Sequence, residues 1–161
     1  MSVAAGAAVA RVALLGAEST GKSTLAQALA ARYGTLWVPE YLREFVDARA
    51  RVPHEDDQPG IARAQLARED ALARDARVQG LLFCDTTPLM TAVYSRVYWG
   101  RVPADLLALE AAHDYAWTLV AAPDLPWVPD GLQRESEEVR QRVHAQLVDV
   151  LDERRIPFIR A

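Results

Sequence analysis

The eight residues from Gly16 to Ser23 limit the possible folds of this chain more than any other segment. They read Gly-Ala-Glu-Ser-Thr-Gly-Lys-Ser, they follow the short apolar run of residues 12–15, and they lead into a helical pattern over residues 22–33. Two glycines allow the backbone to curl with its N–H groups pointing inward, and the helix N-terminus adds partial positive charge. The segment is therefore predicted to bind a chain of phosphates.

The segment matches G-x-x-x-x-G-K-[ST], the P-loop motif, in full and in the required place between a strand and a helix. We expect Lys22 to reach the β- and γ-phosphates of ATP and the Ser23 hydroxyl to bind Mg²⁺. Lys22 is the only lysine in the sequence, so an ammonium occurs at this one place. The predicted nucleotide-binding residues are Gly16, Glu18, Ser19, Thr20, Gly21, Lys22, Ser23 and Thr24.

Composition favours one globular domain spanning residues 1–161, with residues 1–10 as a frayed lead-in. The chain is 51% apolar and 25% charged, which is ordinary for a folded domain of this length. A net charge of −4 and the lack of a basic cluster argue against nucleic acid as a partner. No uncharged apolar run is long enough to cross a membrane, and the single Cys84 fits a reducing cytoplasm.

Apolar runs alternate with helical patterns along the chain, which predicts an α/β fold. We expect a P-loop NTPase three-layer sandwich with a mostly parallel five-stranded sheet. The predicted strands are residues 12–15, 36–38, 81–84, 117–121 and 158–159. The predicted helices are residues 22–33, 40–51, 61–78, 88–98, 103–115 and 135–154, with a turn-rich segment at 53–60 and a proline-rich loop at 123–131.

Two carboxylates follow predicted strands. Asp85 comes directly after residues 81–84, where P-loop proteins place a second metal ligand, although it could merely cap the next helix. Glu40 follows residues 36–38, and the carboxyl ends of parallel strands meet at one edge of a sheet. Glu40 could accept the proton of an attacking hydroxyl, or it could be a glutamate favoured by the helix dipole.

Three blocks of sequence together resemble the ribosylnicotinamide kinase domain of the NadR family. They are the P-loop with its Glu-Ser-Thr insert, the block Pro39-Glu40-Tyr41-Leu42-Arg43-Glu44, and Phe83-Cys84-Asp85-Thr86. The loop with Asp124-Leu125-Pro126-Trp127 and Asp130-Gly131-Leu132 is also similar to that family. The resemblance covers nearly the whole chain.

This resemblance implies ATP-dependent phosphorylation of the 5′-hydroxyl of nicotinamide riboside to nicotinamide mononucleotide, in a stand-alone kinase module. It implies catalytic roles for Lys22, Glu40, Asp85 and Arg134, although Gln133 stands where the family usually has an arginine. The expected substrate contacts are Glu40, Tyr41, Arg43, Trp99, Trp127 and Asp130. The chain stops at Ala161, where P-loop kinases often place a loop that contacts adenine.

Several alternatives stay open at this point. The acceptor could be another nucleoside or a small alcohol, or the chain could be a regulator that binds ATP or NAD with little turnover. Arg43 could contact substrate or lie on an exposed face, and Trp99 could pack with Tyr94 and Tyr98 rather than bind a ring. The sequence does not determine the oligomeric state, the preferred nucleobase or any control by NAD.

Overall fold

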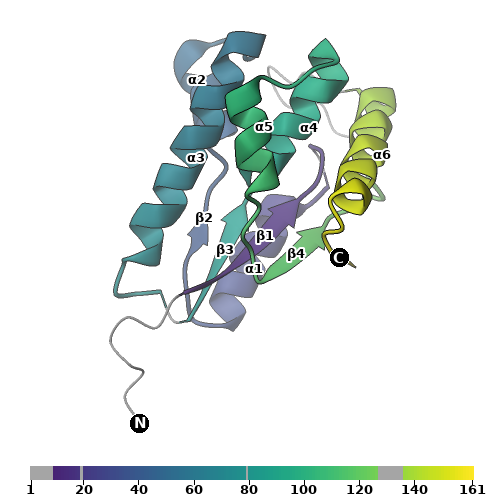
Figure 1. Ribbon diagram of the computed structural model, residues 1–161. Helices are drawn as coiled ribbons and strands as arrows, with labels where there is room; N and C mark the ends of the chain where they lie inside the picture. The colour runs from purple at the N-terminus through teal and green to yellow at the C-terminus, as the bar shows by residue number, and fades with distance from the viewer. Residues whose placement is uncertain (1–8, 19, 79, 127–135) are drawn as a thin grey trace.

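A parallel β-sheet organises the chain (Figure 1), and the computed structural model describes residues 9–18, 20–78, 80–126 and 136–161. Five strands pair in the order β2-β3-β1-β4-β5, and all four pairings are parallel. The strands are β1 (Ala10–Leu15), β2 (Trp37–Val38), β3 (Leu81–Asp85), β4 (Trp117–Val120) and β5 (Ile159–Arg160). The predicted α/β class and its five-stranded sheet are confirmed.

Helices cover both faces of this sheet. They are α1 (Lys22–Arg32), α2 (Tyr41–Arg49), α3 (Gln58–Ala73), α4 (Pro88–Trp99), α5 (Ala104–Ala111) and α6 (Glu137–Glu153), with a short 3₁₀ helix, η1 (Glu55–Asp57). Alternate residues of β1 point to opposite faces, as a strand requires. Val12 and Leu14 pack with α1, whereas Ala13 and Leu15 pack with α4 and α6. The result is the predicted three-layer sandwich.

The helix after the turn-rich segment differs from its prediction at both ends. It was expected over residues 61–78, but α3 runs from Gln58 to Ala73 and η1 precedes it. Pro59 falls in the first turn, where its missing N–H would have no helical partner, so the turn-forming composition of residues 53–60 misled the prediction. After Ala73 the Asp75 carboxylate accepts the backbone N–H of Arg77 at 2.8 Å and so forms a turn.

The helix predicted over residues 103–115 is also shorter. α5 ends at Ala111, and the following residues return the chain to the sheet, where the N–H of Ala116 donates to the Arg11 carbonyl at 2.8 Å. Tyr115 lies beyond the helix, and its hydroxyl donates to the buried carboxylate of Glu69 at 2.8 Å. The other predicted elements differ from the observed ones by one or two residues at their ends, within the described residues.

No helix in the described part of the chain combines the length and the apolar character that a membrane crossing requires.

Candidate active site

The P-loop joins the end of β1 to the start of α1 on the edge of the sheet where the strands end. Gly16 has φ +153°, and a Cβ there would lie 2.8 Å from the carbonyl oxygen of Ala121. Gly21 has φ +81° and caps α1 in the left-handed region. Both positions therefore require glycine. The Thr20 hydroxyl donates to the Ala17 carbonyl at 2.8 Å and closes the loop, while Ser19 lies outside the described residues.

Lys22 lies between the two carboxylates that follow neighbouring strands. Its Nζ is 2.5 Å from Oε2 of Glu40 and 2.9 Å from Oδ1 of Asp85. Asp85 is the last residue of β3 and is fully buried, whereas Glu40 immediately precedes α2. Because β2 and β3 are adjacent and parallel, their ends bring both carboxylates to the first residue of α1.

Charge and burial act in opposite directions on this lysine. Burial by itself would lower the pKa of the Lys22 ammonium, but the negative charges of Asp85 and Glu40 outweigh it and raise that pKa well above its ordinary value. The ammonium is therefore protonated throughout the physiological pH range. A permanent cation held beside a phosphate-binding loop can neutralise charge on a triphosphate.

Ser23 and Asp85 bring a hydroxyl and a carboxylate oxygen together beside the P-loop. The Ser23 hydroxyl donates to Oδ2 of Asp85 at 2.7 Å, so both oxygens are in the same small volume. Within the described residues, no group of three or more His, Cys, Asp and Glu side chains could hold a metal. One hydroxyl and one carboxylate nevertheless fit Mg²⁺, which usually keeps several waters and takes further ligands from the substrate's phosphates.

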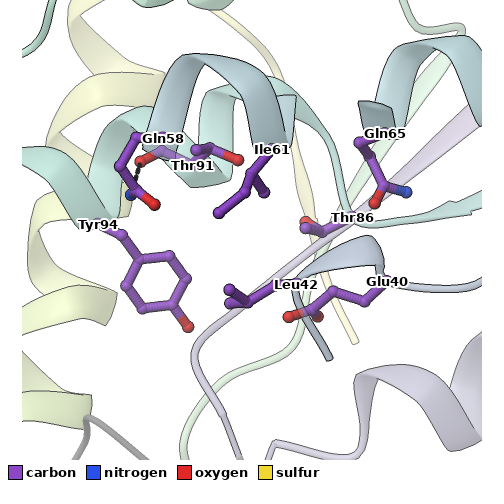
Figure 2. A pocket seen from close by; sticks show the side chains of 8 residues that line it. All are labelled: Glu40, Leu42, Gln58, Ile61, Gln65, Thr86, Thr91 and Tyr94. Carbon is purple, nitrogen blue, oxygen red and sulfur yellow. Dashed lines mark hydrogen bonds between the residues drawn. The ribbon is translucent and has the colours of Figure 1, made fainter. Parts of the chain in front are cut away.

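A narrow cavity begins beside Glu40 and extends between α2, α3 and α4 (Figure 2). Its free volume is about 10 Å³, room for roughly one water. Figure 2 shows Glu40, Thr86 and Gln65 at one end and Gln58, Thr91 and Tyr94 at the other. Leu42 and Ile61 complete the lining. The cavity therefore joins the carboxylate of Glu40 to a mixed polar and aromatic end.

Three residues predicted to contact substrate lie outside this lining. Tyr41 begins α2 with its ring 5.4 Å from the guanidinium carbon of Arg68, and Arg43 is exposed. Trp99 ends α4, and its ring centre lies 5.9 Å from that of Tyr98. This contact belongs to the aromatic packing that was the alternative to a substrate role for Trp99. The predicted roles of Trp127, Asp130 and Arg134 fall on residues outside the described ranges.

Sequence reasoning missed most of the cavity, including Gln58, Gln65 and Thr91, and it assigned Tyr94 to packing alone. The two glutamines lie seven residues apart, so they share a face of α3. Both are buried, at 1% and 3% exposure. Two polar residues at this spacing in a helix rich in alanine and leucine were the available signal.

A buried arginine that the sequence did not single out connects α6 to the neighbourhood of the P-loop. Arg140 is 2% exposed, donates to the Leu125 carbonyl at 2.7 Å and pairs with Glu137 at 2.6 Å. The Leu125 side chain lies 3.2 Å from where a Cβ on Gly21 would be. Arg140 therefore fixes a segment that packs against the phosphate loop.

A second cavity, of about 590 Å³, is larger but has none of the predicted site residues in its lining. Arg11, Glu69, His113 and Tyr115 line it, and Ala10 places it near the start of β1. Burial raises the pKa of Glu69 to about 7 and lowers that of His113 to about 4. Because ligands of open parallel sheets bind at the carboxyl ends of the strands, the smaller cavity beside Glu40 is the better candidate for chemistry.

Comparison with known proteins shows what this chain is similar to. The family model described as an AAA domain matches residues 11–161. The trifunctional NAD biosynthesis/regulator protein NadR of Escherichia coli is 31% identical over 156 residues, which cover 92% of this chain and 37% of that protein. The protein of the same name from Salmonella typhimurium is 31% identical over 155 residues, again 92% and 37% of the two chains. The chain thus spans little more than a third of these curated relatives.

Solved structures give the same result. A NadR protein in complex with NAD and AMP-PNP superposes with a TM-score of 0.77 at 25% identity, covering 94% of this chain and 44% of that one. A NadR protein in complex with NR gives 0.76 at 27% identity, covering 90% and 43%. The resemblance to the NadR family that the sequence motifs indicated is confirmed.

Proposed function

The chain belongs to the AAA-domain family, whose model matches residues 11–161. We propose that it is an ATP-dependent phosphotransferase acting on a hydroxyl group, which its similarity to NadR proteins supports. The observation that carries the proposal is the contact of one ammonium, Lys22, with both Glu40 and Asp85 beside the P-loop. A phosphate-binding loop, a cation and two carboxylates at one sheet edge are the parts that phosphoryl transfer needs.

In this proposal the P-loop backbone and the N-terminus of α1 bind the triphosphate, and Lys22 neutralises it. Ser23 and Asp85 would hold Mg²⁺, which supplies further positive charge to the phosphate oxygens when bound. Glu40 accepts the proton of the acceptor hydroxyl. The acceptor oxygen forms a bond to the γ-phosphorus as the bond from that phosphorus to the β–γ bridging oxygen breaks, and ADP leaves with that oxygen.

We further propose that the acceptor is nicotinamide riboside and the product nicotinamide mononucleotide. The 31% identity to NadR proteins and the similarity to a NadR protein solved with NR support this acceptor. The cavity beside Glu40 supports it too, because Tyr94 offers an aromatic ring at the end away from Glu40. With about 10 Å³ free, the lining side chains must move to admit a riboside.

The acceptor is best identified by competition. The purified protein is given Mg-ATP with nicotinamide riboside, adenosine, thymidine and ribose in one mixture, and the phosphorylated products are separated by mass spectrometry. We expect nicotinamide mononucleotide to dominate, and none to form with the Lys22→Ala variant. Preferential phosphorylation of another acceptor would contradict the riboside assignment, and ATP binding without any phosphorylated product would favour a regulator.

A further inference from the structure

Gln65 connects the backbones of both carboxylate-bearing segments. Its Oε1 accepts the N–H of Tyr41 at 2.8 Å. Its Nε2 donates to the carbonyl oxygen of Pro39 at 3.4 Å and to that of Asp85 at 3.3 Å. One side chain thus holds the residues on either side of Glu40 and, at the same time, the backbone of Asp85.

The chemistry of these contacts permits one orientation of the amide. The oxygen faces an N–H donor, and the NH₂ group faces two carbonyl acceptors, so rotation by 180° would place like groups against one another. Gln65 is 3% exposed, and water therefore cannot easily replace any of these partners. The orientation of the side chain is consequently fixed.

The contact with Tyr41 also caps the start of α2. Glu40 occupies the N-cap position but makes no side-chain capping bond, because its carboxylate contacts Lys22 instead. The first N–H groups of a helix have no partner within the helix. Gln65, which reaches across from α3, accepts one of these groups.

We propose that Gln65 is a positioning residue that fixes Glu40 relative to Asp85, an inference that rests on the proposed function for its catalytic consequence. Both carboxylates contact the same ammonium, at 2.5 and 2.9 Å, so their separation determines where Lys22 lies. A misplacement of about 1 Å in such a constellation can cost about a hundredfold in rate. Gln65 acts through the backbone of Glu40 and not by contact with the reacting atoms.

The first test needs no acceptor. Amide hydrogen exchange is measured by NMR on ¹⁵N-labelled wild-type protein and on Gln65→Met, which keeps the side-chain length and removes every polar contact. The Tyr41 amide should exchange about tenfold faster or more in the variant. Gln58→Met is the matched control, because Gln58 is a buried glutamine of the same helix whose amide donates to the Thr91 carbonyl and the Ser95 hydroxyl. Unchanged exchange at Tyr41 in Gln65→Met would overturn the proposal.

The second test is a double-mutant cycle that combines Gln65→Met with Glu40→Gln. Each rate is divided by the concentration of protein that binds nucleotide, so that unfolded protein does not lower the apparent rate. We expect Gln65→Met alone to lower kcat by about 10- to 100-fold with little change in the KM for ATP. In the Glu40→Gln background the same change should cost less than about threefold. If the rate losses of the two variants are additive, Gln65 acts independently of Glu40. If the KM for the acceptor rises while kcat is normal, Gln65 binds the acceptor directly. Either result would overturn the proposal.

The two tests separate this inference from the proposed function. If wild-type protein phosphorylates no riboside, the assigned acceptor is wrong, and the exchange experiment still decides whether Gln65 holds the start of α2. If wild-type protein is active and Tyr41 exchange responds as expected, the cycle decides whether that contact supports Glu40.

Discussion

Oε2 of Glu40 lies 2.5 Å from Nζ of Lys22, although the two are 18 positions apart in the sequence, with the rest of α1 and β2 between them. The contact arises because Lys22 begins α1, directly after the P-loop, and Glu40 follows β2 at the same edge of the sheet. A carboxylate held there adjoins both the P-loop and the cavity between α2, α3 and α4. This position can accept a proton from a hydroxyl that attacks the terminal phosphate.

Replacing Glu40 with glutamine should separate catalysis from nucleotide binding. The amide cannot take the hydroxyl proton, so we expect kcat to fall by about 10²- to 10⁴-fold while ADP affinity changes little. Initial rates and calorimetric titration with ADP measure the two effects. Glu44→Gln is a suitable control, because Glu44 is an exposed residue of the same helix that pairs with Arg68. Equal activity of Glu40→Gln and wild type would exclude Glu40 as the base.

The Gly16→Ala substitution should distort the P-loop. The new Cβ would meet the Ala121 carbonyl at 2.8 Å, on a backbone with φ +153°. We expect the free energy of unfolding to fall by about 1 to 3 kcal/mol and ATP affinity to fall with it. Urea denaturation and nucleotide titration provide the measurements.

Gly60→Ala provides the contrast for that variant. A Cβ at Gly60 meets nothing within 4 Å, and the residue lies in α3, where alanine is favoured over glycine. This variant should be unchanged or more stable by about 0.5 kcal/mol. Equal losses of unfolding free energy in Gly16→Ala and Gly60→Ala would mean that the close approach of the Ala121 carbonyl to Gly16 does not affect stability.

The buried Glu69 should make stability depend on pH. Burial raises its pKa in the folded state to about 7 from an ordinary 4.5, despite hydrogen bonds from Tyr115 and Arg11 that lower it. Between pH 4.5 and pH 7, Glu69 is protonated in the folded protein but ionised in the unfolded chain. The contribution of Glu69 to the free energy of unfolding is therefore fully present below about pH 4.5 and is lost as the pH rises through 7. The direction is therefore a loss of stability with rising pH.

Glu69→Gln removes this titration. Urea denaturation at each pH gives the free energy of unfolding of the variant minus that of wild type. We expect this difference to increase by about 1 to 3 kcal/mol between pH 5 and pH 8. Glu153→Gln, which removes an exposed carboxylate at the end of α6, serves as the control. A constant difference between Glu69→Gln and wild type would show that Glu69 does not titrate in this range.

The sequence predicted the fold well because its apolar runs are short, uncharged and followed by turn residues. Residues 12–15 became part of the central strand of the sheet and residues 81–84 part of its neighbour, and Gly16 and Gly21 have the positive φ values that their places in the motif required. Ends of helices were less predictable. Pro59 and Gly60 look like loop residues in sequence, yet they fit the first turn of α3.

The cavity beside Glu40 was less predictable because it depends on how helices far apart in sequence pack together. Glu40 and Asp85 were expected to be neighbours because strand order at a parallel edge brings such residues together. Gln58, Gln65 and Tyr94 come from the faces of α3 and α4, and their convergence depends on the packing angle of those helices. Local sequence contains little information on that angle, so the place of Tyr94 in the cavity lining was not predicted.

We propose that this chain transfers the γ-phosphoryl group of ATP to nicotinamide riboside at the site around Lys22. The most direct test measures ADP release from Mg-ATP by purified protein, with and without the riboside, for wild type and for Lys22→Ala. We expect the riboside to stimulate ADP release by wild type and this stimulation to be lost in Lys22→Ala. ATP binding with no stimulation by the riboside, or equal stimulation in Lys22→Ala, would contradict it.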